Sequence, residues 1–396
     1  MQDNEKKPAL RFKGFTDPWE QRKLKELYFQ LTERNADLLP YQKTLSVATM
    51  SFKTDGNGAA DTSLANYKRL RTGDIAFEGH TSKEFRYGRF VLNDVGDGIM
   101  SPRFSALRPL HEMPINFWKY YIHYEPIMRK VLVNSTKAGT MMNELVINEF
   151  LQESILMPSV AEQQAIGRFF KQLDTLITLH QRKYEKLVNI KKSMLDKMFP
   201  KNGASVPEIR FKGFTDPWEQ RKLGEVFEEY SEKNHAELPP LTIIQGGGTI
   251  RRDESERALQ YDKSSLSNYK MVNKDDFIVH LRSFEGGLEK ASSQGIISPA
   301  YHTFHGEDVD SRFYYAYFRS KNFINKDLKP HVYGIRDGRS IDIEGMKTIR
   351  IPWASYPEQK SIGDFLTHLD TLITLHQRKL EKLQNIKKSC LEKMFV

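Results

Sequence analysis

The chain carries the same sequence at two places, and this internal duplication restricts its possible folds more than any other feature. The fourteen residues RFKGFTDPWEQRKL occupy positions 11–24 and recur without a change at 210–223. A longer block at 175–199 recurs at 371–395 with only four substitutions. Stacked-repeat folds need at least three units to bury a continuous core. Two repeats therefore predict one domain fold that is used twice.

The interiors of the two halves differ in sequence, with only short matching segments such as Asn-Tyr-Lys at 66–68 and 268–270. Strand-like runs at 45–49 and 276–280 accompany helical patches around 115–132 and 311–328, separated by Gly, Asn and Asp clusters typical of turns. The pattern predicts an α+β protein with two homologous α/β domains, at 1–158 and 210–353, each opening with its copy of the shared segment.

The repeated block near the end of each half has the spacing of a coiled coil, with seam residues at alternating intervals of four and three. Neither Pro nor Gly interrupts 168–199 or 364–396. We expect one spacer helix within 159–199, a linker at 200–209 and a second spacer helix within 354–396. Two near-identical helices favour antiparallel pairing with internal pseudo-two-fold symmetry. The expected seam comprises Leu173, Ile177, His180, Tyr184, Leu187, Lys191, Met194 and Met198, followed by Leu369, Ile373, His376, Leu380, Leu383, Lys387, Cys390 and Met394.

Polar seam residues can fix the register of a coiled coil, and we prefer this role for His180 and His376 over pH sensing. Cys390 occupies the position of Met194 in the other repeat, so we expect a small core residue rather than a nucleophile. It is the single cysteine of the chain, which excludes a disulfide framework and a cysteine-based metal site. The sequence shows neither a signal peptide nor an apolar run of 18 residues, so we expect a cytoplasmic protein.

Motifs for catalysis are missing from the sequence. The glycines at 246–248 are not followed by the lysine of a phosphate-binding loop. His302 and His305 form the one close histidine pair, without a carboxylate at metal-site spacing, which favours a strand or surface role. We expect no catalytic residue and no metal ion on this chain.

Several segments in the divergent interiors instead have the composition of nucleic-acid contacts. Arginine reads guanine edges, whereas Lys, Ser and Thr hold phosphates. Each segment alone is better explained by a solvated surface, but their recurrence in a duplicated protein of net charge +9 favours DNA. The candidates are Thr81, Ser82, Lys83, Arg86, Tyr87 and Arg89 in the first domain, and Arg251, Arg252, Arg282, Ser283, Tyr333, Arg336 and Arg339 in the second.

The repeated helices and the shared segments have two open interpretations. Residues 162–199 carry a net charge of +4 and residues 358–395 a net charge of +2, which fits either a solvated face or DNA phosphates alongside the helices. Trp19 and Trp218 are candidates for docking a partner protein or for the core, because exposed tryptophans are frequent hot spots but buried ones are commoner.

The chain resembles the specificity (S) subunit of type I restriction-modification systems along essentially its whole length. The resemblance rests on the doubled opening at 8–24 and 207–223, the Glu-Gln-x-x-Ile-Gly motif at 162–167 and 358–363, and the doubled helix. It implies that each divergent half is a target-recognition domain for one half of a bipartite, asymmetric DNA site with an unread spacer. The shared segments would form the spacer coil and the docking surface for two modification (methyltransferase) subunits.

The resemblance also implies a division of labour. The modification subunits would bind S-adenosylmethionine and methylate adenine at N6, and restriction subunits would use ATP and Mg²⁺ for translocation and DNA cleavage. This chain would hold no cofactor and would be the targeting subunit of the complex. Two alternatives remain, namely a stand-alone DNA-binding regulator that needs no partner, and a protein-docking scaffold whose DNA affinity is flat and lost at modest salt.

Overall fold

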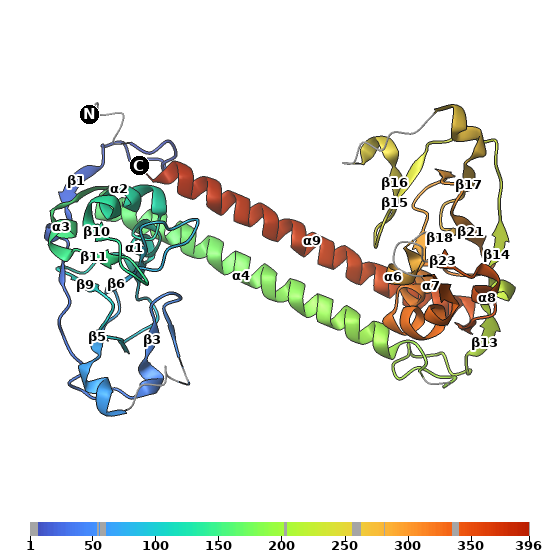
Figure 1. Ribbon diagram of the computed structural model, residues 1–396, viewed down its shortest axis with the longest axis horizontal. Helices are drawn as coiled ribbons and strands as arrows, with labels where there is room; N and C mark the ends of the chain where they lie inside the picture. Colours follow the sequence, from blue (N-terminus) through green and yellow to red (C-terminus); the bar gives the residue numbers. More distant parts are fainter. Residues whose placement is uncertain are drawn as a thin grey trace. The chain divides into compact units, whose positions relative to one another are not determined.

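The computed structural model describes residues 7–53, 55, 61–201, 204–255, 263–280, 282–334 and 340–395. It divides into two compact units, each of mixed helix and strand (Figure 1). Unit 1 comprises Met1–Gln181 with Arg378–Val396, and unit 2 comprises Arg182–Gln377. Each unit therefore contains one divergent interior and parts of both repeated helices.

Unit 1 is built around a four-stranded antiparallel sheet of order β2-β9-β6-β7, with smaller strand pairs and three short helices beside it. The sheet strands are β2 (Tyr28–Gln30), β9 (Ala106–Pro109), β6 (Ile75–Glu78) and β7 (Arg89–Leu92). The pairs are β1 (Glu20–Lys23) with β12 (Ser154–Met157), β3 (Leu45–Ser46) with β4 (Ser51–Phe52), β5 (Lys68–Leu70) with β8 (Gly98–Met100), and β10 (Thr136–Lys137) with β11 (Glu144–Leu145). The helices are α1 (Ile115–Tyr121), α2 (Glu125–Ser135) and α3 (Ile147–Gln152), with a 3₁₀ turn, η2, at Leu24–Glu26.

Unit 2 repeats this plan with its own strands and helices. Its sheet has the order β14-β21-β18-β19, from β14 (Glu228–Tyr230), β21 (His302–His305), β18 (Phe277–Val279) and β19 (Glu289–Lys290). The pairs are β13 (Glu219–Lys222) with β24 (Arg350–Trp353), β15 (Leu241–Ile244) with β16 (Gly248–Arg251), β17 (Lys270–Val272) with β20 (Gly295–Ile297), and β22 (Val332–Tyr333) with β23 (Ser340–Ile341). The helices are α5 (Leu223–Val226), α6 (Ser283–Gly286), α7 (Ser311–Phe318), a π-helix, η7, at Phe323–Leu328, and α8 (Ile343–Lys347).

The element order and strand pairing of unit 2 match those of unit 1, which confirms the prediction of one α/β fold used twice. The expected strand at 45–49 is shorter than predicted. It ends at Ser46, because the Met50 amide donates to the Ser46 carbonyl at 2.8 Å and Met50 takes a positive φ of 45°, which turns the chain back into β4.

The two repeated blocks form the long helices α4 (Val160–Lys197) and α9 (Tyr356–Met394). In unit 1, the first part of α4 lies beside the last part of α9, where Lys387 Nζ is 2.7 Å from Asp174 Oδ1. In unit 2, the last part of α4 lies beside the first part of α9, joined by an ion pair between Lys191 and Asp370. Within each unit the two helices are therefore antiparallel.

The Glu-Gln-x-x-Ile-Gly motif fastens the start of each helix to its domain. Glu162 is 2 % exposed and accepts two hydrogen bonds, at 2.8 and 2.6 Å, from Arg11 of the shared opening segment. Glu358 accepts the same pair from Arg210, at 2.6 and 2.8 Å. A buried carboxylate needs such a paired, hydrogen-bonded cation, since ionised groups are costly to bury alone.

The glycine of this motif permits a close approach between helices. A Cβ atom on Gly167 would lie 2.7 Å from the amide nitrogen of Phe117 in α1. A Cβ atom on Gly363 would lie 2.6 Å from Asp310 Oδ1, at the start of α7. Any side chain at either glycine would separate the long helix from the aromatic helix that it covers.

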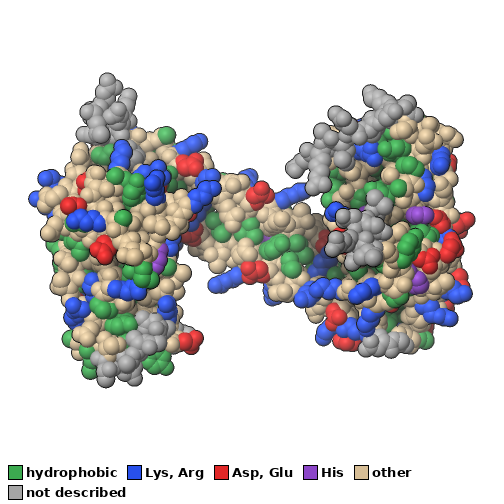
Figure 2. All heavy atoms as spheres, in the orientation of Figure 1, with side chains coloured by type: hydrophobic (Ala, Val, Ile, Leu, Met, Phe, Trp, Pro, Cys, Tyr) green, Lys and Arg blue, Asp and Glu red, His purple; other side chains and the backbone are tan. Residues whose placement is uncertain are grey.

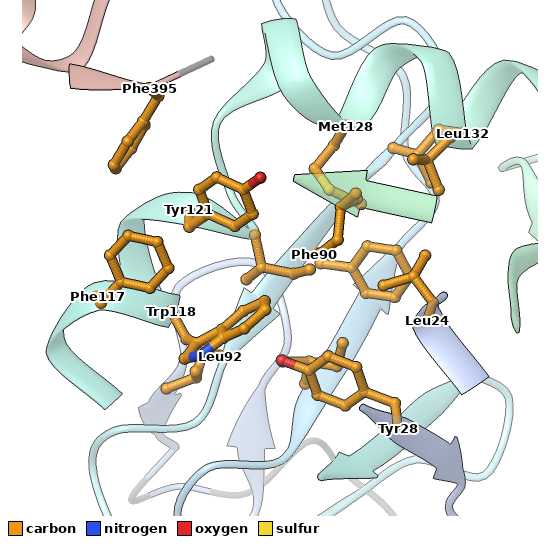
Figure 3. Packing of buried hydrophobic residues seen from close by; sticks show 14 of the residues in the cluster. Leu24, Tyr28, Phe90, Leu92, Phe117, Trp118, Tyr121, Met128, Leu132 and Phe395 are labelled. Atoms are coloured by element: carbon orange, nitrogen blue, oxygen red, sulfur yellow. The ribbon is translucent and has the colours of Figure 1, made fainter. Parts of the chain in front are cut away.

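Each domain core is completed by the end of the helix from the other repeat. Phe395, just after α9, lies 5.4 to 5.9 Å from the rings of Tyr121, Phe117 and Phe170 in unit 1 (Figure 3). Phe199, just after α4, lies 5.0 Å from the ring of Phe313 in unit 2. Both phenylalanines are 6 % exposed, so Phe395 is a core residue of a domain that is distant in sequence, and Phe199 is a core residue of the domain that follows it.

We predict that Phe395→Ala destabilises unit 1 by about 3–5 kcal/mol, because the substitution removes a buried aromatic ring and leaves a cavity. Limited proteolysis of the variant should cut first within unit 1, and urea unfolding should show an early transition. Phe199→Ala should produce the mirror result, with early cleavage in unit 2.

Phe29→Ala is the matched control, since this side chain is 43 % exposed and exposed substitutions usually change stability by about 0.5 kcal/mol or less. An unchanged unfolding curve for Phe395→Ala would contradict the assignment of the helix end to the core.

Candidate nucleic-acid interface

In unit 1, the candidate residues 81–89 lie in the connection between β6 and β7. A glycine stands near each end of this loop, and each meets backbone too closely for a side chain. A Cβ atom on Gly79 would lie 2.1 Å from the Asn143 carbonyl oxygen, and one on Gly88, whose φ is +85°, would lie 2.8 Å from the Glu78 carbonyl oxygen. The ends of the loop are therefore fixed by backbone packing.

The six candidate side chains of this loop divide into two groups. Thr81, Lys83 and Arg86 are exposed, so they are available to a ligand. Ser82, which is also exposed, and the half-buried Tyr87 and Arg89 make contacts within the protein that shape the loop.

Those contacts centre on Phe85, which is buried. The Ser82 hydroxyl accepts a hydrogen bond from the Phe85 amide at 3.0 Å. The guanidinium of Arg89 lies 4.9 Å from the Phe85 ring centre and donates to the Ala48 carbonyl at 3.0 Å. Tyr87 is half-buried against the core. These residues hold the loop in the shape that displays Lys83 and Arg86.

In unit 2, the equivalent connection between β18 and β19 contains the short helix α6. Arg282 precedes this helix and is exposed. Burial, together with the positive charges of Arg319 and Arg282, lowers the pKa of His280 to about 4, so this imidazole is neutral at physiological pH.

The expectation that Ser283 contacts DNA is wrong. This serine is 0 % exposed, and its hydroxyl accepts the His280 amide at 2.9 Å. Short hydroxyl side chains commonly close turns in this way, and the closed turn leaves Arg282 as the exposed candidate in the segment.

A buried carboxylate anchors this part of unit 2. Glu289 in β19 is 0 % exposed and accepts the amides of Gly246 and Gly248 at 2.6 and 3.2 Å. It also accepts the Tyr315 hydroxyl at 2.8 Å and pairs with Arg319. The turn of the β15–β16 hairpin is therefore tied to the sheet and to α7, close to the connection that carries Arg282.

Arg251 and Arg252 lie at the other end of that hairpin. Arg251 is exposed and pairs with Asp253 at 3.0 Å. Arg252 is half-buried, with its guanidinium 5.2 Å from the Tyr269 ring centre and a hydrogen bond to the Leu241 carbonyl. The structure thus separates these two arginines from Arg282, and Arg252 packs within the domain.

The last candidate segment of unit 2 joins β22 to β23. Tyr333 is 59 % exposed at the end of β22. Arg336 and Arg339 lie outside the described residues.

A cleft of about 440 Å³ in unit 1 is lined by residues of the shared opening segment and the start of α4. A larger cleft, of about 800 Å³, adjoins the candidate loop. Lys83 and Arg89 line one part of the larger cleft, and Lys387 and Lys388 of α9 line another. His123 also lines it, and burial lowers the pKa of this histidine below its usual range. The candidate loop and the end of α9 thus contribute cations to one recess, which the carboxylates of Glu84, Asp94, Glu125, Asp174 and Glu392 also line.

Acidic side chains mark a surface of unit 2 that is unsuited to nucleic acid. Figure 2 shows them gathered at the edge that carries β14, where Glu228 and Glu232 are exposed. Carboxylates at this edge would repel phosphates. A polyanion would therefore be disfavoured at the β14 edge of unit 2.

The seam residues of the long helices are the least exposed positions along most of their length. Each of the sixteen is buried or half-buried, including His180 and His376, whereas Leu176, Leu179 and Leu375 between them are 43 to 45 % exposed. Burial raises the pKa of the Cys390 thiol, and its side chain packs in the core of unit 1.

Trp19 and Trp218 occupy the cores, which is one of the two roles that the sequence left open for them. They are 2 % and 3 % exposed. The Trp218 indole nitrogen donates to Glu358 Oε2 at 3.0 Å, and the Trp19 ring lies 6.5 Å from that of Phe117. Their burial leaves the exposed residues around them, such as Lys13 and Thr16, as the accessible part of the shared segment.

Two features of the site were not predicted. One is the Arg–Glu bridge in each unit, although both residues recur in the repeats and could have been paired on that basis. The other is the hairpin loop at 138–143, whose Asn143 amide donates to the Gly79 carbonyl at 2.9 Å.

The described residues contain no group of three or more His, Cys, Asp or Glu side chains arranged to hold a metal ion. Among the same residues, no helix is both long and apolar enough to cross a membrane.

The chain is similar to known proteins over nearly its whole length. Residues 215–385 match the family model of the type I restriction modification DNA specificity domain. A putative type I restriction enzyme MjaX specificity subunit from Methanocaldococcus jannaschii is 22 % identical over 94 % of this chain and 91 % of its own length. The type I restriction enzyme MjaVIII specificity subunit from the same organism is 24 % identical over 68 % of this chain and 67 % of its own length.

A solved structure supports the same relationship at the level of the fold. The S subunit of a type I restriction-modification system from M. genitalium matches with a TM-score of 0.58 at 14 % identity, covering 98 % of this chain and 99 % of the other. The matched domain, the relatives and the shared fold thus make this chain similar to type I restriction-modification specificity subunits.

Proposed function

We propose that this chain directs a type I restriction-modification complex to a bipartite, asymmetric DNA site. The domain of unit 1 would read one half of the site and the domain of unit 2 the other, with a spacer between them that neither domain reads. The single observation that carries the proposal is one fold used twice, with common sequence at the frame and different side chains in the equivalent loops.

The charges of the candidate loops favour double-stranded DNA as the ligand. Lys83 and Arg86 in unit 1, and Arg282 in unit 2, are exposed in equivalent connections of the two sheets. Arginine can read guanine in the major groove and lysine can hold phosphate. Because the two loops differ in sequence, two copies of one fold would recognise two different half-sites.

The chemistry would belong to partner subunits. Two modification subunits would bring S-adenosylmethionine to adenine N6, and restriction subunits would bring ATP and Mg²⁺ for translocation and cleavage. Methylation requires the target adenine to leave the base stack, at a cost of a few kcal/mol. The contacts that this chain makes to both half-sites would offset that cost.

Methylation mapping of host DNA is the direct test. With the partner genes intact, deletion of the gene for this chain should remove N6-methyladenine from one gapped, asymmetric motif. Restoring the gene should restore the mark. Methylation that persists after the deletion would reject the proposal, and tight DNA binding without any partner would favour the regulator alternative.

We predict that Lys83→Ala weakens binding of the complex to its mapped site and lowers the salt dependence of binding. Loss of one phosphate contact should reduce the slope of log K against log salt by about 0.9. The measurement is a titration at several salt concentrations.

Lys25→Ala supplies the matched control, because Lys25 is exposed in the 3₁₀ turn η2, outside the candidate loop. If both variants changed the slope of log K against log salt equally, the effect would come from the net charge of the protein. That result would contradict a phosphate contact at Lys83.

We also predict that the paired helices set the length of the unread spacer. Deleting seven residues from both α4 and α9 preserves the seam pattern and removes about 10 Å of helix. The mapped motif should keep its half-sites and change its gap by about three base pairs, at about 3.4 Å per base pair. A motif with both its half-sites and its gap unchanged would show that the helices do not set this spacing.

A further inference from the structure

The hairpin loop at 138–143 of unit 1 displays an unusual side chain. It joins β10 to β11 and has the sequence Ala-Gly-Thr-Met-Met-Asn. Met141 is 80 % exposed, the highest value among the large apolar residues that the structure describes. A single exposed apolar residue is common, so the position of the loop decides whether this one has a function.

Two hydrogen bonds attach the hairpin loop to the candidate DNA-binding loop. The Asn143 amide donates to the Gly79 carbonyl at 2.9 Å, and the Asn143 side-chain amide donates to the Arg86 carbonyl at 3.2 Å. The two loops therefore share one surface, and Met141 is presented on a segment that contacts both ends of the loop carrying Lys83.

The charges around the hairpin loop suit a polyanion. Lys137 immediately precedes it and is exposed, as are Lys83 and Arg86 on the neighbouring loop; with the exposed Glu84 and Glu144, three cations and two carboxylates leave a net charge of +1. A methionine among cations would be poorly placed against an apolar protein surface, where these charges would have to be desolvated. It is well placed in a DNA groove, where cations hold the phosphates and an apolar group meets the bases.

Unit 2 has a hairpin at the same point of the fold. The pair β22–β23 has the same place in the order of elements as the pair β10–β11. In unit 1, β10–β11 follows α2 and precedes α3, and in unit 2, β22–β23 follows the π-helix η7 and precedes α8. The connecting segments have equal length, 138–143 and 334–339, but the second is Gly-Ile-Arg-Asp-Gly-Arg. The segment of unit 2 thus contains two arginines, with Asp337 at the position that corresponds to Met141, whereas the segment of unit 1 contains no arginine.

This difference indicates different base preferences. Arginine donates to guanine, whereas an apolar side chain contacts the methyl group of thymine. Methionine is flexible and polarizable, which suits contact with a single methyl group. Resting on the proposed function above, we propose that Met141 contacts a thymine methyl group in the half-site read by unit 1.

The test uses the complete complex and duplex DNA carrying the mapped site. Each thymine of the site is replaced in turn by deoxyuridine, which lacks only the methyl group. For the unaltered complex, one replacement should weaken binding by about fourfold, as expected for the loss of one buried methyl-sized group. For Met141→Ala, the thymine duplex should bind correspondingly less well, and the same replacement should have no further effect.

Val133→Ala is the matched control, an exposed apolar residue of α2 that is 47 % exposed. It should keep the full discrimination between thymine and deoxyuridine, and all three proteins should unfold at the same temperature. Full discrimination in Met141→Ala, or its absence in the unaltered complex, would overturn the proposal. A complex that does not bind the thymine duplex at all would instead reject the proposed function.

Discussion

Each domain of this protein depends on an aromatic ring supplied by the other half of the sequence. Phe395 completes the core of unit 1, and Phe199 completes the core of unit 2. Backbone hydrogen bonds join the same segments, since the Leu10 amide donates to the Lys393 carbonyl and the Ile209 amide donates to the Lys197 carbonyl. Because burial of apolar area is the dominant favourable term in folding, neither interior can reach its full stability without the opposite helix. The long helices are therefore parts of both domains as well as connections between them.

A second set of contacts fixes where each helix begins. The Arg11–Glu162 and Arg210–Glu358 bridges join the opening segment to the first turn of the helix, and Gly167 and Gly363 bring that turn against the aromatic helix of the domain. All of these residues lie in repeated sequence. The divergent residues are therefore not needed to attach the helix to its domain. Loops such as 80–88 can change their side chains while the repeated residues that position them stay the same.

Sequence reasoning predicted the frame better than the surface. Repetition and the four-three spacing identified the duplicated fold and the long helices, because both signals come from many residues acting together. Whether a single residue is exposed or packed within the domain depends on tertiary contacts, which a local sequence pattern does not predict. Ser283 closes a turn, Arg252 packs on Tyr269, and Trp19 lies in the core, although their residue types suit binding equally well. The hairpin at 138–143 was missed because its composition is neither basic nor aromatic, and only its tertiary contacts with Gly79 and Arg86 place it beside the candidate loop.

The repeated contacts also define which part of the sequence could be exchanged between the two halves, namely the divergent interior between the opening segment and the long helix. An interior exchanged between the opening segment and the start of the long helix would meet the same arginine, glutamate and glycine at its new location. It would also meet a phenylalanine from the opposite helix, since Phe199 and Phe395 occupy equivalent positions. An exchange that included the long helix would instead also move Phe199 or Phe395, the phenylalanine that completes the core of the other domain. Recombination within this gene is thus expected to shuffle interiors and to leave the helices in place, so that new combinations of recognition loops arise without a new fold.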